Sequence, residues 1–281
     1  MHLLKQLFNY NLQNYIPVKF RGKNIGWINK KEKQFLKSYG FDSNFIDGKK
    51  LLLILKKNLF TSSRKNSEQE FCPIFNFNAL SPKLNFCHKK PFGEKNIFII
   101  ERELLSFFGF PQYGIHGNGW TEYKKRIFFH FAIRSKNLNH FPGQYDNLFA
   151  GGQPQGISIL KNLKKEAFEE VGLKINPKNL VRGSTVNYFH EFSGRIHSGI
   201  IFIYHLKIKK KNFVNIDGEV ERFETIDAFE IYKLLESKKL KPNCIIPIAD
   251  FFLRNMNDLF PKKGILEIER LLNNGRKIKS L

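Results

Sequence analysis

Three glutamates, Glu166, Glu169 and Glu170, lie close together near the middle of this chain. Their i, i+3 and i+4 spacing places all three on one face of a helix. Like charges at this distance repel each other, and the chain as a whole has a net charge of +22, so a bound cation is a natural reason to keep them together. On spacing alone, however, a solvated acidic helix face paired with Lys164 and Lys165 is the better explanation.

The elements that must position these glutamates can be predicted from the flanking sequence. The stretch 150–173 reads AGGQPQGISILKNLKKEAFEEVGL, which is a glycine pair, a turn and then a helix that stops at Gly172. Strand patterns precede and follow it, and amphipathic helices close the chain. This order predicts an α/β sandwich with a mixed sheet. The expected strands are 113–122 (or a hairpin), 126–134, 180–191 and 197–208, and the expected later helices are 226–237, 245–256 and 266–272.

The first hundred residues have a different texture and predict a separate, smaller α+β domain. We therefore divide the chain into an N-terminal domain of unknown role, residues 1–100, and a second domain, residues 101–281. Within and just after the first domain, the patterns predict a hairpin over 18–27 around Gly22 and a helix over 30–39 capped by Asn29. They also predict a buried strand over 51–55 and a helix over 99–107.

Bulk composition excludes several classes of protein. With 42% hydrophobic residues and 30 phenylalanines, the chain has enough apolar surface for a substantial core. Three widely spaced cysteines fit a reducing compartment better than a disulfide framework. The lysines are spread along the chain, so a nucleic-acid partner is not expected despite the charge. The sequence has no apolar segment long enough to predict a targeting signal or a membrane span. We therefore expect a soluble, cytoplasmic protein.

The stretch 150–173 resembles a Nudix box, whose pattern is G-x5-E-x7-R-E-U-x-E-E-x-G-U with U a bulky aliphatic residue. With Gly172 on the last glycine of the pattern, Gly151 falls on the first, and the three glutamates fall on the metal-site glutamates of the family. Three positions depart from the pattern: Ile157 replaces the early glutamate, Lys165 replaces the arginine, and Ala167 is a small U. In the family the first two positions brace the loop against the helix, so this pair of changes implies altered bracing.

The resemblance extends beyond the box and implies a subgroup. The segments 101–120, 142–158, 217–224 and 241–255 are similar to Nudix proteins fused or related to fungal thiamine pyrophosphokinase, and to their stand-alone plant relatives. That subgroup carries an additional domain ahead of its box, in the position of the first hundred residues here. The resemblance therefore implies a Nudix-type α/β/α sandwich preceded by a smaller domain.

By this resemblance the chain is a Nudix hydrolase that cleaves a diphosphate linkage with the help of Mg²⁺, or of Mn²⁺ in its place. The implied metal ligands are Glu166, Glu169 and Glu170, with a backbone carbonyl at Gly151. Glu170 is also assigned to catalysis. The segment DGEVERFE supplies Glu219, which we prefer as the general base, and leaves an exposed strand edge as the alternative.

Substrate contacts are predicted from side chains near the box. His116, Asn118 and Trp120 alternate along a predicted strand, and Trp120 is able to stack on a heteroaromatic ring. A role in the core or at its rim explains these three residues equally well. Lys165 is expected either to contact phosphate or to brace the loop. Glu221 is expected to bind substrate or metal, or to act as the general base in place of Glu219.

Three functions follow from these assignments. The first is hydrolysis of thiamine diphosphate, or of damaged and analogue forms such as oxythiamine diphosphate, to a monophosphate and phosphate. The second is hydrolysis of an oxidised guanine nucleotide or another nucleoside diphosphate derivative. The third is a non-catalytic Nudix module that senses a ligand or binds RNA. The expected partner is a small-molecule diphosphate, with no membrane partner, and a homodimer is one option for the assembly.

Overall fold

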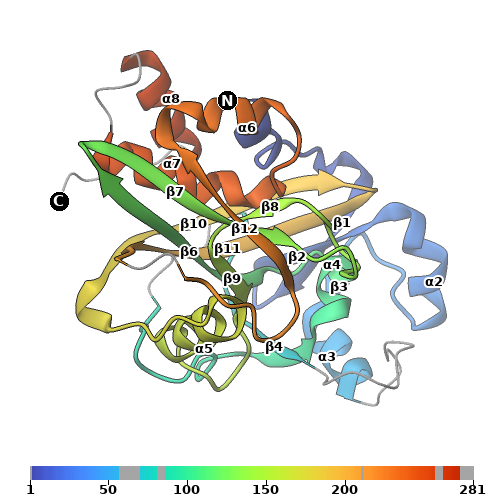
Figure 1. The fold of residues 1–281 in the computed structure, drawn as a ribbon. Coiled ribbons are helices and arrows are strands. Elements are labelled where there is room, and N and C mark those ends of the chain that lie inside the picture. The colour runs from blue at the N-terminus through green and yellow to red at the C-terminus, as the bar shows by residue number, and fades with distance from the viewer. Residues whose placement is uncertain (1, 57–69, 81–85, 210–211, 257–261, 273–281) are drawn as a thin grey trace.

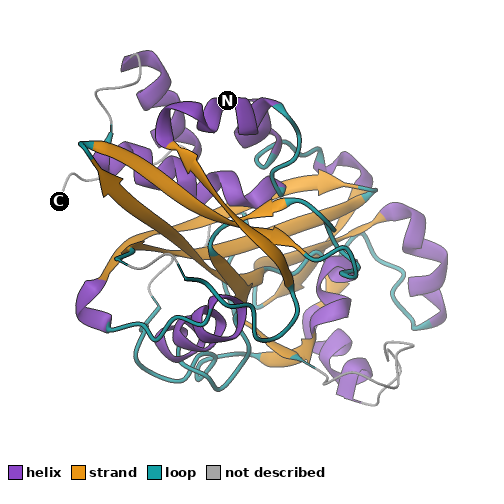
Figure 2. Cartoon of the chain, viewed as in Figure 1, coloured by secondary structure: helices purple, strands orange, loops and turns teal. Residues whose placement is uncertain are grey.

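A mixed β-sheet with helices on both faces forms the larger part of the molecule (Figures 1 and 2). The computed structural model describes residues 2–56, 70–80, 86–209, 212–256 and 262–272. Within these residues the sheet has the strand order β10-β11-β6-β7-β12, with β8 beside β7 and β9 beside β6. The predicted α/β/α architecture is thus confirmed. The strands are β6 (Gln112–Tyr123), β7 (Arg126–Arg134), β8 (Tyr145–Asp146), β9 (Phe149–Gly152), β10 (Leu180–Phe192), β11 (Arg195–Lys207) and β12 (Val220–Asp227).

The two central strands β6 and β7 separate part-way along their length. They pair antiparallel from Gly119–Tyr123 to Arg126–His130, next to their connecting turn. Farther from the turn, β6 pairs with β9 and β7 pairs with β8. The short β8–β9 segment therefore fills the gap between the separated strands, and it leads directly into the glycine pair of the box.

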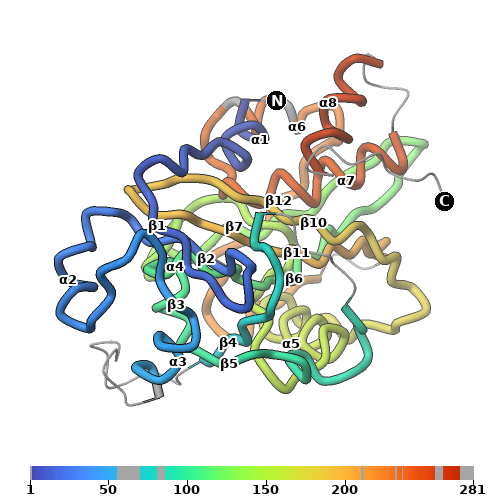
Figure 3. Tube along the Cα trace, turned by 180° about the vertical axis from the view of Figure 1, so that it is seen from behind, coloured from blue at the N-terminus to red at the C-terminus, as the bar shows by residue number. Residues whose placement is uncertain are grey.

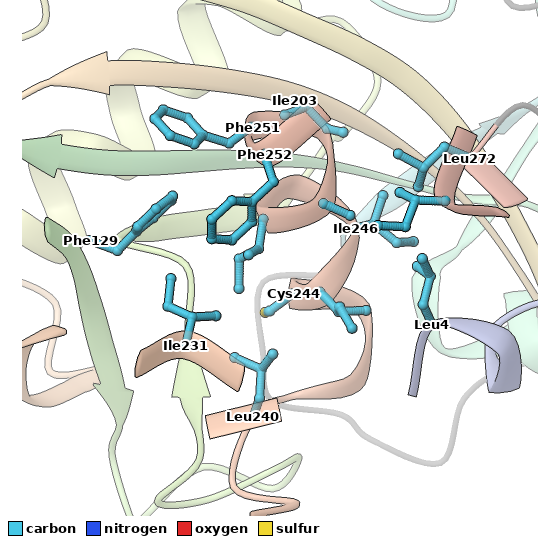
Figure 4. Packing of buried hydrophobic residues seen from close by; sticks show 14 of the residues in the cluster. Leu4, Phe129, Ile203, Ile231, Leu240, Cys244, Ile246, Phe251, Phe252 and Leu272 are labelled. Carbon is cyan, nitrogen blue, oxygen red and sulfur yellow. The ribbon is translucent and has the colours of Figure 1, made fainter. Parts of the chain in front are cut away.

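Each face of the sheet packs against its own helical layer. One face and helix α5 (Ile159–Val171) share a core that includes Ile115, Leu163 and Phe202. The other face packs on α7 (Ile245–Asn255), with contributions from α1 (His2–Gln6), α6 (Ile231–Glu236) and α8 (Lys262–Leu272). Figure 4 shows this second core, in which Phe251 and Phe252 of α7 pack near Phe129 of β7.

The N-terminal part forms an α+β unit beside the end of this sandwich (Figure 3). Strands β1 (Tyr15–Phe20), β2 (Lys23–Asn29) and β3 (Ile46–Asp47) form one small sheet. Strands β4 (Phe71–Ile74) and β5 (Phe98–Glu101) form a second one. Within its described residues, three helices complete the unit: α2 (Lys33–Ser38), α3 (Gly48–Lys56) and α4 (Leu105–Phe108). Its core extends past residue 100 to Phe110, whereas Leu4 packs in the α7 core, so the boundary at 100 stays a prediction.

Two local predictions were wrong, and the first concerns a short apolar run. Residues 51–55, predicted as a buried strand, lie inside helix α3, and Leu53 is exposed. The carboxylate of Asp47 accepts a hydrogen bond from the Lys49 amide and starts this helix. The helix predicted over 99–107 is instead strand β5, a 3₁₀ turn over Arg102–Leu104 and the short α4. Five apolar residues in a row do not distinguish a strand from a helix.

Other predictions were confirmed, including the hairpin at Gly22 and the cap at Asn29. The side chain of Asn29 accepts a hydrogen bond from the Lys31 amide, as expected for a helix start. Strand β6 is a single strand, not a hairpin, and β7 spans the predicted residues 126–134. None of the helices among the described residues is both long enough and apolar enough to cross a membrane.

Candidate active site

Helix α5 carries the three glutamates, and its two ends are fixed by the box sequence. At its start the hydroxyl of Ser158 accepts a hydrogen bond from the Lys161 amide. At its end Gly172 adopts a left-handed conformation with φ 68°, which favours glycine. The amide of Ile216 donates to the carbonyl of Glu169, so the segment before β12 is held against the last turn of the helix. The helix therefore has a defined position against β9 and β12.

Gly151 makes room for the carboxylate of Glu166. A Cβ atom added at Gly151 would lie 2.2 Å from Cδ of Glu166 and 2.5 Å from each carboxylate oxygen. These distances are far shorter than a non-bonded contact allows, so Glu166 occupies space that any other residue at position 151 would fill. The predicted juxtaposition of Gly151 with the helix carboxylates is present in the structure.

Glu170 lies deeper, against the backbone of β9. Its Oε2 accepts a hydrogen bond of 2.8 Å from the amide of Ala150, and the residue is only 6% exposed. Burial raises the pKa of Glu170 well above its ordinary value, and the nearby carboxylates of Asp146, Glu166 and Glu219 raise it further. Burying a carboxylate among other carboxylates is unfavourable unless a cation or a proton balances the charge.

Glu219 approaches the same cluster from the segment ahead of β12. Its negative charge raises the pKa of both Glu166 and Glu170, which places it near both. Burial, and then the charges of Glu169, Glu219 and Glu70, raise the pKa of Glu166 to about 7, although Lys165 acts in the opposite direction. Glu219 itself is exposed and precedes the first residue of β12. The structure thus gathers the four glutamates that we predicted to form the site.

Lys165 and Glu221 are engaged by neighbouring charges at the rim. The ammonium of Lys165 lies 2.7 Å from Glu169 and 3.6 Å from Glu166. Glu221 lies 3.7 Å from Lys136, on a strand whose register shifts between Val220 and Arg222. In a regular strand, Glu219 and Glu221 would share one face because they are two residues apart, and this irregularity breaks that alternation. Substrate contacts by Lys165 and Glu221 stay predictions.

His116, Asn118 and Trp120 share the α7 face of β6, opposite α5. Asn118 is 2% exposed and donates to the carbonyl of Pro247, 2.7 Å away. Trp120 packs edge-on against Phe251, with ring centroids 5.4 Å apart. The structure therefore places Asn118 and Trp120 in the core, which was the alternative role, and not beside the glutamates. His116 lies opposite Ala150 in the register and is therefore next to the glycine pair of β9. Its substrate role stays a prediction.

A second group of metal-ligand types is formed by His116, Asp146 and Cys244, whose ligand atoms lie within 4.8 Å of one another. All three residues are buried. The carboxylate of Asp146 already has two cationic partners, Lys241 at 2.8 Å and Arg134 at 3.0 Å. These two cations would oppose a divalent ion, and they hold the pKa of Asp146 far below its usual range. Asp146 also accepts from the amide of Asn147, so this cluster fixes the β8–β9 segment.

The loop between β9 and α5 is braced by amide side chains in place of the family's glutamate–arginine pair. Gln153 is fully buried, and its Nε2 donates to the carbonyl of Ile157 at 2.8 Å. Asn162 on the first turns of α5 donates to the carbonyl of Gly152 at 2.7 Å. The amide of Phe92 also donates to the carbonyl of Ile157. The altered bracing that we predicted from Ile157 and Lys165 thus consists of hydrogen bonds from side-chain amides to loop carbonyls.

Two residues near the site were not singled out in the sequence. Arg102 lies directly against Gly152, and its guanidinium pairs with Glu70 at 2.9 Å. Both residues lie far from the box in the sequence, so the spacing of residues within the box could not predict that they are near the site. The only indication was that Arg102 falls within the segment 101–120, which carries part of the resemblance.

Comparison with known proteins gives relatives at the sequence level, while no family model matches the chain. Nudix hydrolase 24, chloroplastic, of Arabidopsis thaliana is 32% identical over 191 residues, which cover 66% of this chain and 52% of that protein. Nudix hydrolase 20, chloroplastic, of the same organism is 28% identical over 281 residues, which cover 94% of this chain and 74% of that protein.

These relatives support membership of the Nudix hydrolase family. The chain spans about half the length of the first of them. Among solved structures, the Nudix domain of Shewanella oneidensis NrtR complexed with ADP ribose is similar with a TM-score of 0.42 and 11% identity, over 51% of this chain and 88% of that one. The segment that resembles a Nudix box in the sequence forms the β9–loop–α5 unit of this structure, with Gly151 and the glutamates at its centre.

Proposed function

We propose that the protein is a Mg²⁺-dependent hydrolase that cleaves a diphosphate linkage. The observation that carries this proposal is that Glu166 and Glu170 lie against β9, at Gly151 and at the amide of Ala150. The charges of Glu169 and Glu219 act on this pair. Carboxylate and carbonyl oxygens are the ligands that Mg²⁺ prefers. The carboxylates present here repel one another when ionised, and a bound cation would offset that repulsion. The residues therefore fit the metal that the family implies.

When bound, Mg²⁺ neutralises charge on phosphate oxygens and lowers the pKa of a water molecule. The protein supplies the remaining functions. Glu166 and Glu170 would hold the ion, together with Glu169 and a carbonyl at Gly151. Glu219 is exposed to solvent beside them, so we assign it as the base that takes a proton from the attacking water. Gly151 leaves room for the carboxylate of Glu166 beside its own carbonyl.

For the substrate we propose thiamine diphosphate or its damaged and analogue forms, such as oxythiamine diphosphate. The support for this choice is the similarity of the four segments outside the box to the thiamine-related subgroup. Oxidised guanine nucleotides and other nucleoside diphosphate derivatives are the second candidate class. A binding module without catalysis is disfavoured, since a pure binder has no need for a buried carboxylate such as Glu170 beside three others.

A panel of diphosphates tests the activity and the substrate class together. Purified protein is incubated with thiamine diphosphate, oxythiamine diphosphate, 8-oxo-dGDP and ADP-ribose, with excess Mg²⁺ or with EDTA. The monophosphate products are quantified by anion-exchange chromatography, because ADP-ribose would yield AMP and ribose 5-phosphate without free phosphate. We expect Mg²⁺-dependent turnover with the highest kcat/KM on a thiamine derivative. A higher kcat/KM on nucleotides would select the second class, and no turnover on any compound would contradict the hydrolase.

The crowded carboxylates also predict an unusual pH dependence of stability. Because the pKa of Glu166 rises from 4.5 to about 7 on folding, the folded metal-free protein holds this proton more tightly than the unfolded chain. The contribution of Glu166 to the free energy of unfolding is fully present below about pH 4.5. As the pH rises to about 7 this contribution is lost, and the loss amounts to up to roughly 3 kcal/mol. Glu170 shifts in the same direction.

Thermal unfolding with EDTA should therefore show a lower Tm at about pH 8 than at about pH 5. Added Mg²⁺ should reverse this trend, since it binds the deprotonated carboxylates and stabilises the folded state by mass action. A Tm increase with Mg²⁺ that is equal at both pH values would show that protons and metal do not compete at this cluster. CaCl₂ and NaCl at matched ionic strength serve as controls.

A further inference from the structure

Arg102 occupies the position that a side chain on Gly152 would take. It follows strand β5 directly, in the N-terminal half of the chain, yet it reaches the glycine pair of β9. A Cβ atom added at Gly152 would lie 1.1 Å from Nη2 and 2.0 Å from Cζ of Arg102. The guanidinium group therefore lies flat against the backbone of the Nudix box, one residue from the glycine that accommodates Glu166.

Backbone hydrogen bonds hold Arg102 in this place. Its amide donates to the carbonyl of Glu70, and the amide of Gln155 in the box loop donates to the carbonyl of Phe71. The guanidinium Nη1 lies 2.9 Å from the Glu70 carboxylate, which is among the charges that raise the pKa of Glu166. Arg102 and Glu70 are thus an ion pair at the edge of the carboxylate cluster, and both side chains are about one-third exposed.

Gly152, the residue of β9 that Arg102 touches, is paired with strand β6. Gly152 lies opposite Gly114 in the register, so the two glycines form a surface without side chains, which we call the glycine floor. An added Cβ at Gly114 would meet only ordinary contacts, at 3.4 Å from the Gly151 carbonyl oxygen and 3.9 Å from His116. Arg102 and His116 therefore border the glycine floor, whereas Glu166 lies on the opposite face of β9.

We propose that Arg102 binds a phosphate oxygen of the substrate at the end of β9, where Gly152 is the last residue of the strand, exchanging its partner Glu70 for the phosphate. This inference rests on the proposed hydrolase function. Glu70 pairs with Arg102 and is among the charges that act on Glu166, so a phosphate that takes the place of Glu70 would lie at the edge of the carboxylate cluster. Such a phosphate needs a positive partner, and arginine provides paired N–H donors that match it. The N-terminal part of the chain thus supplies a substrate-binding residue to the Nudix site.

The test measures binding separately from turnover. Imidodiphosphate, whose P–N–P bridge resists hydrolysis, is titrated into wild-type protein and into Arg102→Ala by calorimetry with Mg²⁺ present. We expect the Kd to rise about 10–100-fold in the variant, with a parallel rise of KM on the best substrate of the panel. Arg102→Lys should fall between the two, because it retains the charge and loses the paired donors.

Two further variants separate binding from structure. Gly152→Ala displaces the guanidinium without removing its charge and should also weaken imidodiphosphate binding. Glu70→Gln removes the competing carboxylate and should leave the Kd unchanged or lower. The control is Arg126→Ala, which breaks an ion pair with Asp227 at the β6–β7 turn and should change neither Kd nor KM.

Two results would decide against the proposal or separate it from the hydrolase assignment. A lower Tm in Arg102→Ala with a Kd within about twofold of wild type would show that Arg102 only ties the two parts of the chain together, and would overturn the proposal. If wild-type protein hydrolyses no diphosphate but binds imidodiphosphate in an Arg102-dependent way, the hydrolase fails while the phosphate contact is supported.

Discussion

Replacing Glu170 by glutamine should lower kcat by about 10²–10⁴-fold, the range for loss of a positioned catalytic group, without unfolding the protein. Glu170 is buried, and burial raises its pKa well above the ordinary value, which favours the protonated acid in the metal-free protein. Glutamine has nearly the same shape as the protonated acid, and its carbonyl oxygen can still accept the hydrogen bond from Ala150. The fold therefore loses little, whereas the negative charge available to a cation is lost.

The two effects are separated by measuring Tm with EDTA and with Mg²⁺. In Glu170→Gln we expect an unchanged Tm in EDTA and a smaller increase on adding Mg²⁺ than in wild type. Glu230→Gln is the matched control, since Glu230 is an exposed glutamate paired with Lys233 outside the site. Wild-type kcat in Glu170→Gln would remove Glu170 from the mechanism, whatever the metal dependence.

The register of the box was the part of the site that sequence predicted best. Gly151 and Gly172 fixed the alignment, and the helix phase then brought Glu166 and Glu170 against β9. Such contacts are local: they need one strand, one loop and one helix whose ends are set by Ser158 and Gly172. Local geometry follows from spacing, so a one-dimensional pattern is sufficient to predict it.

Contacts between segments that are distant in the sequence could not be predicted from residue spacing. Arg102 reaches Gly152 because β5 pairs with β4 and this pair is hydrogen-bonded to the box loop, which no periodicity reports. Asn118 was a polar residue on an apolar strand, and only the packing of α7 reveals that the Pro247 carbonyl satisfies it. In the same way, the apolar run 51–55 fits a strand or a helix until its neighbours are known.

Replacing Gly151 by alanine should reduce kcat/KM by about 10–100-fold, through the position of Glu166. The new methyl group would lie 2.2 Å from the Glu166 carboxylate carbon, and the carboxylate end of a flexible side chain moves away more easily than the backbone. Gly151 has no left-handed backbone conformation, so alanine adds no strain of its own. We therefore expect an almost unchanged Tm in EDTA and a higher Mg²⁺ concentration for half-maximal activity.

Gly264→Ala makes the same chemical change where nothing lies within 4 Å of the added atom, in helix α8. It should leave activity unchanged and stabilise the protein slightly, since alanine favours helix. If only Gly151→Ala lowers kcat/KM, the loss is due to the displaced carboxylate of Glu166 and not to the reduced backbone freedom that both substitutions cause. If Gly151→Ala retains wild-type kcat/KM and wild-type Mg²⁺ dependence, Glu166 does not act from the position against β9. In that case the metal platform would have to rest on Glu169, Glu170 and Glu219 alone.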